Sequence, residues 1–264
     1  MPFSHANGVK IWFETAGDGP AMVLIHANPF DHDLWLYQTA HFSTWFNVVT
    51  IDIRGYGRSV KMIEPFTLND MCNDVVGVMS DLGLKRAILG GCSVGSGTAL
   101  LLALDHPELF EALFLVGGNS GASSRYQRRI DGYVGDLPAY HGKHIRELVS
   151  SSFATSKIGS HLLDMFTERG PRLKGEAIAQ VFAAGNSTAT TERLAEIKVP
   201  TLVINGEYDH SLEAGKRTAN LIPGAEHKML AGTGHACCIE DPAEFNRFVL
   251  AFLQARGLIP ELCP

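Results

Sequence analysis

Ser93, Asp209 and His235 are the residues of this chain whose types and spacing suit nucleophilic catalysis. Ser93 lies at the centre of a glycine-flanked run between a strand pattern and a helix pattern, Gly91-Cys92-Ser93-Val94-Gly95. A sharp strand-to-helix turn exposes its central side chain and tolerates only small residues on either side. The turn also places the hydroxyl at a helix N-terminus, where backbone N–H groups favour a developing negative charge. Such a run can arise by chance, but its placement indicates a nucleophile.

A serine hydroxyl needs a base that takes its proton, and the base needs a partner that orients it. Asp209 follows the apolar run at 201–206, and His235 follows the run that ends near Leu230. Taken singly, an aspartate after a strand is more often a helix cap, and a histidine beside glycine is more often a loop residue. Taken in the order Ser, Asp, His, the three predict a catalytic triad with His235 as base.

Runs of apolar residues alternate with helical patterns through most of the chain and must position these groups. Two β-rich runs at 9–15 and 22–27, with glycine and proline between them, predict an antiparallel hairpin. Further strands are expected at 47–52, 87–91, 112–116, 200–204 and 228–230, and helices at 69–82, 97–106 and from Asp241 onward. Continuous apolar strands that alternate with helices predict an α/β protein with a mainly parallel sheet covered on both faces.

Residues 119–196 interrupt this alternation. They contain no convincing strand, and helical patterns occur at 145–150, 158–167 and 176–184. A loop of this length without structure is improbable in a compact domain. We therefore expect a core domain formed by residues 1–118 and 197–264, with a helical cap at 119–196 inserted into it.

Four further segments show that the chain resembles the α/β-hydrolase superfamily along nearly its full length. His26-Ala27-Asn28-Pro29 resembles the His-Gly-x-Pro loop of that family, with alanine in place of glycine. The run at 52–59 resembles its structural Asp-x-Arg-Gly-x-Gly-x-Ser turn, and residues 234–242 resemble its Gly-His-x-x-x-x-Glu-x-Pro ending. The helical insertion lies where family members carry a cap. The resemblance implies an eight-stranded, mostly parallel, twisted sheet with helices on both faces.

The resemblance also implies a site. The backbone N–H groups of Asn28 and Val94 would form the oxyanion hole, and no metal or organic cofactor would be required. The run Asp31-His32-Asp33 lacks further metal ligands and is interpreted as a loop near the pocket mouth. Four aromatic residues are expected either in the core or in the wall of the substrate pocket: Phe30, Trp35, Phe153 and Phe166.

The identity of the nucleophile limits the chemistry. Dehalogenases and epoxide hydrolases of the superfamily use aspartate where this chain has Ser93. Hydrolysis of esters, thioesters and lactones remains, together with carbon–carbon bond hydrolysis of vinylogous diketones and cofactor-free perhydrolysis. We predict a carboxylic-ester or lactone hydrolase that acts through an acyl-enzyme on a small to medium, partly apolar substrate. A triad-bearing ligand receptor or signalling protein with slow turnover is the alternative from another class.

Composition excludes several other classes. The 264 residues carry a net charge of −6 without charged blocks, so neither nucleic acid nor an anionic membrane is an expected partner. Five cysteines, an odd number without metal-ligand spacing, favour a reducing compartment, and no signal peptide or membrane-spanning run is evident. We therefore expect a cytoplasmic protein with a small-molecule substrate. The sequence leaves open whether it is a monomer or a homodimer.

Overall fold

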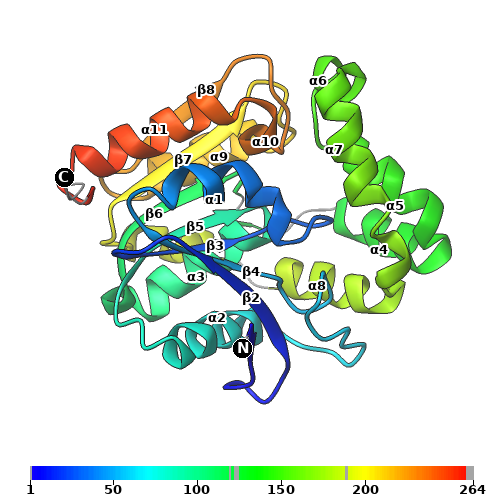
Figure 1. Ribbon diagram of the computed structural model, residues 1–264, viewed down its shortest axis with the longest axis horizontal. Helices are drawn as coiled ribbons and strands as arrows, with labels where there is room; N and C mark the ends of the chain where they lie inside the picture. Colours follow the sequence, from blue (N-terminus) through cyan, green and yellow to red (C-terminus); the bar gives the residue numbers. More distant parts are fainter. Residues whose placement is uncertain (1, 119, 122–124, 188–189, 260–264) are drawn as a thin grey trace.

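The computed structural model describes residues 2–118, 120–121, 125–187 and 190–259, and an eight-stranded sheet is its centre (Figure 1). The strand order is β1-β2-β4-β3-β5-β6-β7-β8. β1 and β2 pair antiparallel, β2 joins β4 antiparallel, and every pairing from β4 to β8 is parallel. The strands are β1 (Phe3–Ser4), β2 (Ile11–Ala16), β3 (Ala21–Ile25), β4 (Asn47–Ile51), β5 (Ala87–Cys92), β6 (Phe110–Val116), β7 (Thr201–Gly206) and β8 (Glu226–Leu230). The predicted mostly parallel sheet is confirmed.

The predicted hairpin between the first two long strands is wrong, because β4 lies between β2 and β3. Val49 of β4 is aligned with Thr15 on one side and with Val23 on the other. All five residues of β3 are buried, which suits a strand with a neighbour on each side. The loop after β2 instead packs on the segment before β4, and a Cβ at Gly17 would lie 2.3 Å from the Ser43 carbonyl oxygen. Turn residues therefore marked a reversal without identifying the partner strand.

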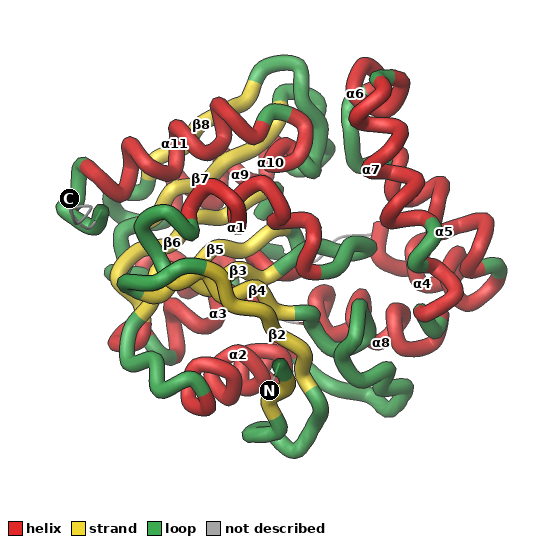
Figure 2. Tube along the Cα trace, in the orientation of Figure 1, coloured by secondary structure: helices red, strands yellow, loops and turns green. Residues whose placement is uncertain are grey.

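Alternate residues of each strand face two separate hydrophobic layers, as the period of a strand requires. Val23 and Ile25 belong to the layer shared with α2, α3 and α9, whereas Met22 and Leu24 belong to the layer shared with α1 and α11. These helices are α1 (Leu36–Phe42), α2 (Leu68–Asp81), α3 (Val94–Asp105), α9 (Leu212–Leu221) and α11 (Pro242–Gln254). Asp241 caps α11 by accepting a hydrogen bond from the backbone N–H of Glu244, as its sequence predicts. Figure 2 shows helices on both sides of the strands.

Among the described residues, five α-helices lie between β6 and β7 in the chain, and we call this segment the helical insertion. They are α4 (Arg125–Gly135), α5 (Leu137–Arg146), α6 (Ser151–Thr155), α7 (Lys157–Thr167) and α8 (Gly175–Ser187). The insertion stands beside the sheet, at the right of Figure 1. The helix expected at 145–150 is wrong, because α5 ends at Arg146 and the Ser150 hydroxyl accepts a hydrogen bond from the Phe153 N–H, which caps α6.

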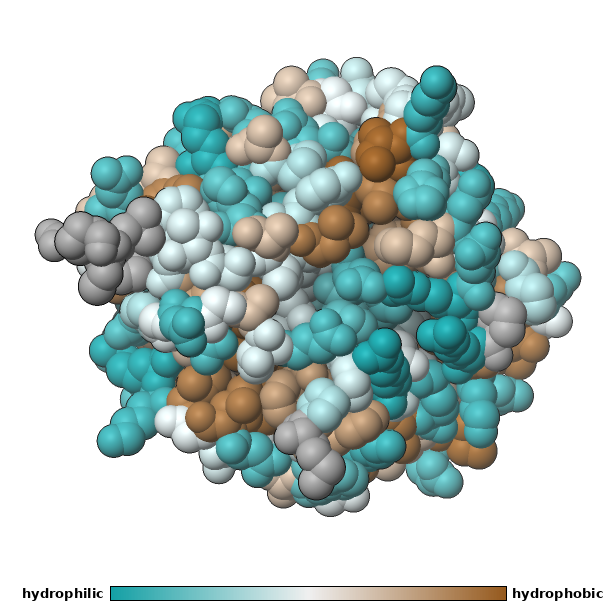
Figure 3. Space-filling view, in the orientation of Figure 1, coloured by the Kyte–Doolittle hydropathy of each residue, from teal (hydrophilic) through white to brown (hydrophobic). Residues whose placement is uncertain are grey.

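Few large hydrophobic side chains are exposed among the residues that the structure describes: Ile63, Val134, Ile158, Tyr208, Leu221 and Met229. The face in Figure 3 is mostly hydrophilic, with hydrophobic residues in small groups. In the described part of the chain, no helix has the length and apolarity needed to cross a bilayer.

Candidate active site

Ser93 occupies a strained turn between β5 and α3. Its backbone φ is 54° and its ψ is −111°, and no other non-glycine residue among those described has a positive φ. Such a conformation costs about 1–3 kcal/mol and persists only where surrounding contacts impose it. Here the Ser93 N–H donates to the Val116 carbonyl (2.8 Å), and the Ser93 carbonyl accepts from the Gly97 N–H (3.1 Å). The strain indicates a functional residue at the end of β5.

Close backbone packing explains the two glycines around this turn. A Cβ at Gly91 would lie 2.3 Å from the carbonyl oxygen of Gly95, and a Cβ at Gly95 would lie 2.3 Å from that of Ile25. Neither position can hold a larger residue without moving backbone atoms. The Ser96 hydroxyl adds hydrogen bonds to the carbonyls of Gly91 (2.7 Å) and Val116 (3.0 Å). The turn is thus fixed from both sides.

Asp209 and His235 form a buried hydrogen-bonded pair after β7 and β8. His235 Nδ1 lies 2.7 Å from Asp209 Oδ1. Burial alone would raise the pKa of Asp209, but the charge and hydrogen bond of His235, together with hydrogen bonds from Ser211 and Asn205, hold it well below its usual value. An ionised carboxylate only accepts hydrogen bonds, so Nδ1 carries a proton, and in the neutral imidazole Nε2 is left as the acceptor.

A cavity of about 340 Å³ is shared by two of the three predicted catalytic residues. Ser93 and His235 both line it, and so does Asn28 from the loop after β3. Gly117, the residue after β6, lies so close to the imidazole that a Cβ there would be 2.6 Å from His235 Cε1. The carboxyl ends of β5, β7 and β8 thus bring serine, aspartate and histidine to one edge of the sheet, as expected for ligand sites in open α/β sheets.

The loop that carries His235 is held by Glu240. The Glu240 carboxylate accepts hydrogen bonds from the N–H of Gly234 (2.7 Å) and from the N–H of Ser150 in the helical insertion (2.9 Å). The Ala236 N–H also donates to the Leu148 carbonyl of the insertion (2.9 Å). Glu240 therefore couples the position of the histidine loop to the insertion.

Hydrogen bonds of His26 hold the loop after β3, which carries the predicted oxyanion donor Asn28. His26 Nδ1 donates to the Ala27 carbonyl (3.0 Å), and its Nε2 accepts from the Ile53 N–H (3.0 Å). Asn28 and Val94 are both buried, the latter as the first residue of α3. The carboxamide oxygen of Asn28 has no hydrogen-bond partner among the described residues.

Several residues of the cavity wall were not found by sequence reasoning. His210 stacks on His235 with ring centroids 4.4 Å apart, and burial, followed by the nearby His235, lowers the pKa of His210 to about 3. The other missed residues come largely from the helical insertion: Arg125, Tyr126, Arg129, His144, Leu148 and Phe182. The spacing of Arg125 and Arg129 fits one helix face, but the sequence does not say what that face meets.

Asp209, His210 and His235 also approach one another closely enough to be considered as metal ligands, with one ligand atom of each within 4.8 Å of the others. However, Asp209 Oδ1 already accepts from His235, from the Ser211 N–H (2.8 Å) and from the Ser211 hydroxyl (2.9 Å). A metal would have to break this network. The donor set suits a histidine–carboxylate pair better than a metal centre.

The four aromatic residues considered for the pocket wall do not line the cavity at Ser93. Trp35 is fully buried and packs near Phe114 and Phe245, and Phe153 belongs to the same hydrophobic layer. Phe30 and Phe166 pack edge to face at 4.9 Å and line a second, smaller cavity of about 80 Å³. The pocket interpretation is therefore wrong for this site, because aromatic side chains suit a core and a pocket wall equally.

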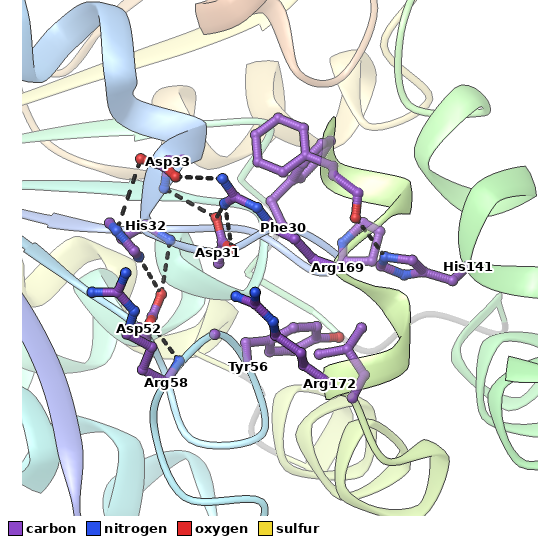
Figure 4. Close-up of a pocket in the computed structure, with 14 residues that line it drawn as sticks. Phe30, Asp31, His32, Asp33, Asp52, Tyr56, Arg58, His141, Arg169 and Arg172 are labelled. Atoms are coloured by element: carbon purple, nitrogen blue, oxygen red, sulfur yellow. Dashed lines mark hydrogen bonds and ion pairs between the residues drawn. The ribbon is translucent and has the colours of Figure 1, made fainter. Parts of the chain in front are cut away.

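The second cavity lies where the helical insertion meets the core (Figure 4). Arg169 of the insertion reaches Asp31 (2.6 Å) and Asp33 (2.7 Å), and His32 Nδ1 lies 2.7 Å from Asp52 Oδ1. Burial would lower the pKa of His32, but the hydrogen bond and charge of Asp52 raise it to about 9. Burial would likewise raise the pKa of Asp52, yet His32 lowers it to about 2. Asp31 and Asp33 thus pair with the insertion, whereas His32 pairs with Asp52 within the core.

Cys92, beside the candidate nucleophile, is fully buried in the sheet. A hydrogen bond to Cys238, together with burial, raises the pKa of its thiol well above the usual value. A thiol that stays protonated is a poor nucleophile. Ser93 is therefore the better candidate.

Comparisons with known proteins agree with the observed fold. Residues 20–242 match a family profile described as alpha/beta hydrolase fold. A dihydrolipoyllysine-residue acetyltransferase component of the acetoin cleaving system from Cupriavidus necator is 29% identical over 92% of this chain, which spans 66% of that protein, just under two thirds. A 2-hydroxy-6-oxononadienedioate/2-hydroxy-6-oxononatrienedioate hydrolase from Paraburkholderia phymatum is 27% identical over 93% of this chain and 91% of its own length. The crystal structure of an enol-lactonase from Burkholderia xenovorans superposes with a TM-score of 0.90 at 26% identity, covering 96% of this chain and all of that one.

Proposed function

The chain belongs to the α/β-hydrolase family, and from this premise we propose that it is a serine hydrolase of carboxylic esters or lactones. Ser93 is the nucleophile, His235 the general base and Asp209 the group that orients the imidazole. The observation that carries the proposal is the strained Ser93 at the wall of a cavity shared with His235, whose Nδ1 is held 2.7 Å from Asp209. A cavity of about 340 Å³ suits a small molecule.

In the proposed reaction, His235 Nε2 takes the Ser93 proton while Ser93 Oγ attacks the carbonyl carbon. The ionised Asp209 stabilises the imidazolium without taking its proton. The backbone N–H groups of Asn28 and Val94 stabilise the oxyanion, and loss of one such donor typically raises the barrier by about 3 kcal/mol. His235 then gives its proton to the leaving oxygen, and a water activated by the same imidazole releases the acid.

The helical insertion acts in this proposal as the cap that shapes the substrate site. It supplies Arg125, Tyr126 and Phe182 to the wall of the cavity that Ser93 also lines. Its ion pairs through Arg169 and the Glu240 contact would hold it in place.

Likeness to an enol-lactonase supports a lactone or ester as the bond that is cleaved. A second candidate is carbon–carbon hydrolysis of a vinylogous diketone. It is favoured by the 27% identical relative, whose named substrate carries both a hydroxy and an oxo group. Turnover of matched esters, lactones and diketones separates the two candidates.

The proposal is tested with Ser93→Ala and the surface control Ser160→Ala. We expect Ser93→Ala to reduce kcat for p-nitrophenyl butyrate by about 10³-fold or more, since the remaining groups act only with the nucleophile. Its melting temperature should stay within a few degrees of that of the wild type, and Ser160→Ala should keep full activity. A fluorophosphonate probe should label Ser93. Retained activity in Ser93→Ala, or a label on Cys92, would contradict the assignment, while ligand binding without turnover would favour a receptor.

A further inference from the structure

The wall of the Ser93 cavity carries positive charge from α4 of the helical insertion. Arg125 and Arg129, four residues apart on this helix, both line the cavity. Arg129 is buried, with 9% of its surface exposed. None of the described residues that line the cavity is an aspartate or a glutamate.

Glu147 does not fully balance the charge of Arg129. Arg129 pairs with Glu147 at 2.7 Å, but Glu147 also lies 3.4 Å from Arg128 and 3.9 Å from Lys143. One carboxylate thus serves three cations. Asp209, the acid next to the cavity, is already engaged by His235 and three other hydrogen-bond donors.

The histidines of the wall do not account for the charge. Burial, followed by the charge of Arg129, lowers the pKa of His144 well below its usual value. Burial and His235 lower the pKa of His210 to about 3, and Arg125 and Arg129 act in the same direction. Both rings are therefore neutral near pH 7, and the positive field in the cavity comes from the arginines.

We propose that the substrate carries a carboxylate remote from its scissile carbonyl, and that Arg125 and Arg129 bind this carboxylate while Ser93 attacks. A partly buried guanidinium gains most from an ionised partner with matching planar geometry, which a carboxylate provides. The inference rests on the proposed function and narrows it to acidic esters or lactones, such as half-esters of dicarboxylic acids. The partly apolar substrate predicted from sequence becomes an amphipathic, anionic one.

The test compares two esters that differ only in charge: mono-p-nitrophenyl glutarate and its neutral methyl ester. We expect kcat/KM near pH 7 to favour the anionic ester by about tenfold to a hundredfold, the range that a charge-assisted hydrogen bond provides. Arg129→Met and Arg125→Met should each reduce this ratio toward one. The ratio is the readout because it is insensitive to the fraction of folded enzyme. If Arg129→Met does not fold, because it loses the Glu147 pair, then the wild-type ratio and Arg125→Met decide.

Arg128→Met is the matched control. It removes the same charge from the same helix and contacts the same glutamate, but its side chain is 71% exposed and does not line the cavity. It should leave the ratio unchanged. A wild-type ratio at or below one, or a ratio that falls equally in Arg128→Met, would overturn the inference.

The outcomes separate this inference from the proposed function. Serine-dependent turnover without preference for the anionic ester overturns the charge recognition alone. Turnover that survives Ser93→Ala overturns the proposed function whatever the ratio. If neither ester is cleaved, the proposed function fails, and the thermal shift with glutarate against glutaramide still decides the inference. A shift with glutarate that is lost in Arg125→Met supports it, and equal shifts contradict it.

Discussion

Substitution of Gly117 by alanine should damage catalysis through the position of one ring. Gly117 has a φ of 58° and lies beside His235, so an added Cβ would be 2.6 Å from Cε1 and 2.7 Å from Nδ1 of the imidazole. An ordinary contact begins at 3.4 Å, so the ring would have to move by about 0.8 Å. That movement would also disturb the 2.7 Å hydrogen bond to Asp209.

The size of the effect follows from this displacement. A misplacement of about 1 Å in a catalytic group can reduce the rate by about 100-fold. We therefore expect Gly117→Ala to lower kcat for an ester substrate by about 30-fold to 100-fold. A non-glycine residue at positive φ also costs about 1–2 kcal/mol of stability, and this part of the effect has nothing to do with the ring.

Gly83→Ala separates the two contributions. Gly83 has a φ of 67°, so alanine is strained there as well, but an added Cβ meets nothing within 4 Å. Steady-state kinetics and thermal unfolding of both variants give the comparison. The reasoning predicts similar losses of stability and a loss of kcat only in Gly117→Ala. If kcat in Gly117→Ala stays within about threefold of that in Gly83→Ala, contact with Gly117 does not position the imidazole.

Two further predictions concern the charged pairs. Asp209→Asn should lower kcat by about 10⁴-fold, because an amide donor facing His235 Nδ1 moves the ring proton to Nε2, which can then no longer accept the Ser93 proton. Little change in kcat in a steady-state assay would contradict this role of Asp209. His32→Gln should flatten the dependence of stability on pH. The raised pKa of His32, about 9, gives stability that is complete below its unfolded value of 6.5 and is lost as pH rises through 9. The lowered pKa of Asp52, about 2, gives stability that is present above 3.8 and is lost as pH falls through 2. Wild type should thus lose about 2–3 kcal/mol more than His32→Gln between about pH 7 and about pH 10 in denaturant unfolding, and parallel curves would exclude the pair as the cause.

The parts of the site that the sequence predicted are those imposed by short-range contacts. Gly91 and Gly95 are required by backbone atoms that approach within 2.3 Å, so the turn around Ser93 leaves a pattern in five consecutive residues. Asp209 lies three residues after the end of β7 and His235 five residues after the end of β8, and parallel strands bring their ends to the same edge. Local chemistry and strand order were enough to predict that these residues would lie close together.

The parts that escaped prediction depend on which elements pack together. The turn at 17–20 has the composition of a hairpin, yet the insertion of β4 between β2 and β3 is decided by burial on both faces of β3. Arg125 and Arg129 form a polar pair on α4, and only the packing of that helix turns them toward Ser93. Aromatic residues such as Phe30 and Trp35 are compatible with several environments, so their type alone did not place them.

The direct pairing of β6 with β7 bears on how such a protein can change its specificity. Val116 is aligned with Ile204 as if the long excursion between them were absent. The entropic cost of closing a loop rises only slowly with its length. A different inserted segment can therefore join the two strands at these two points with little loss of stability of the sheet. Evolution can therefore exchange recognition helices while the reacting groups are inherited unchanged, and chimaeras joined at the same two points would graft one protein's selectivity onto another's chemistry.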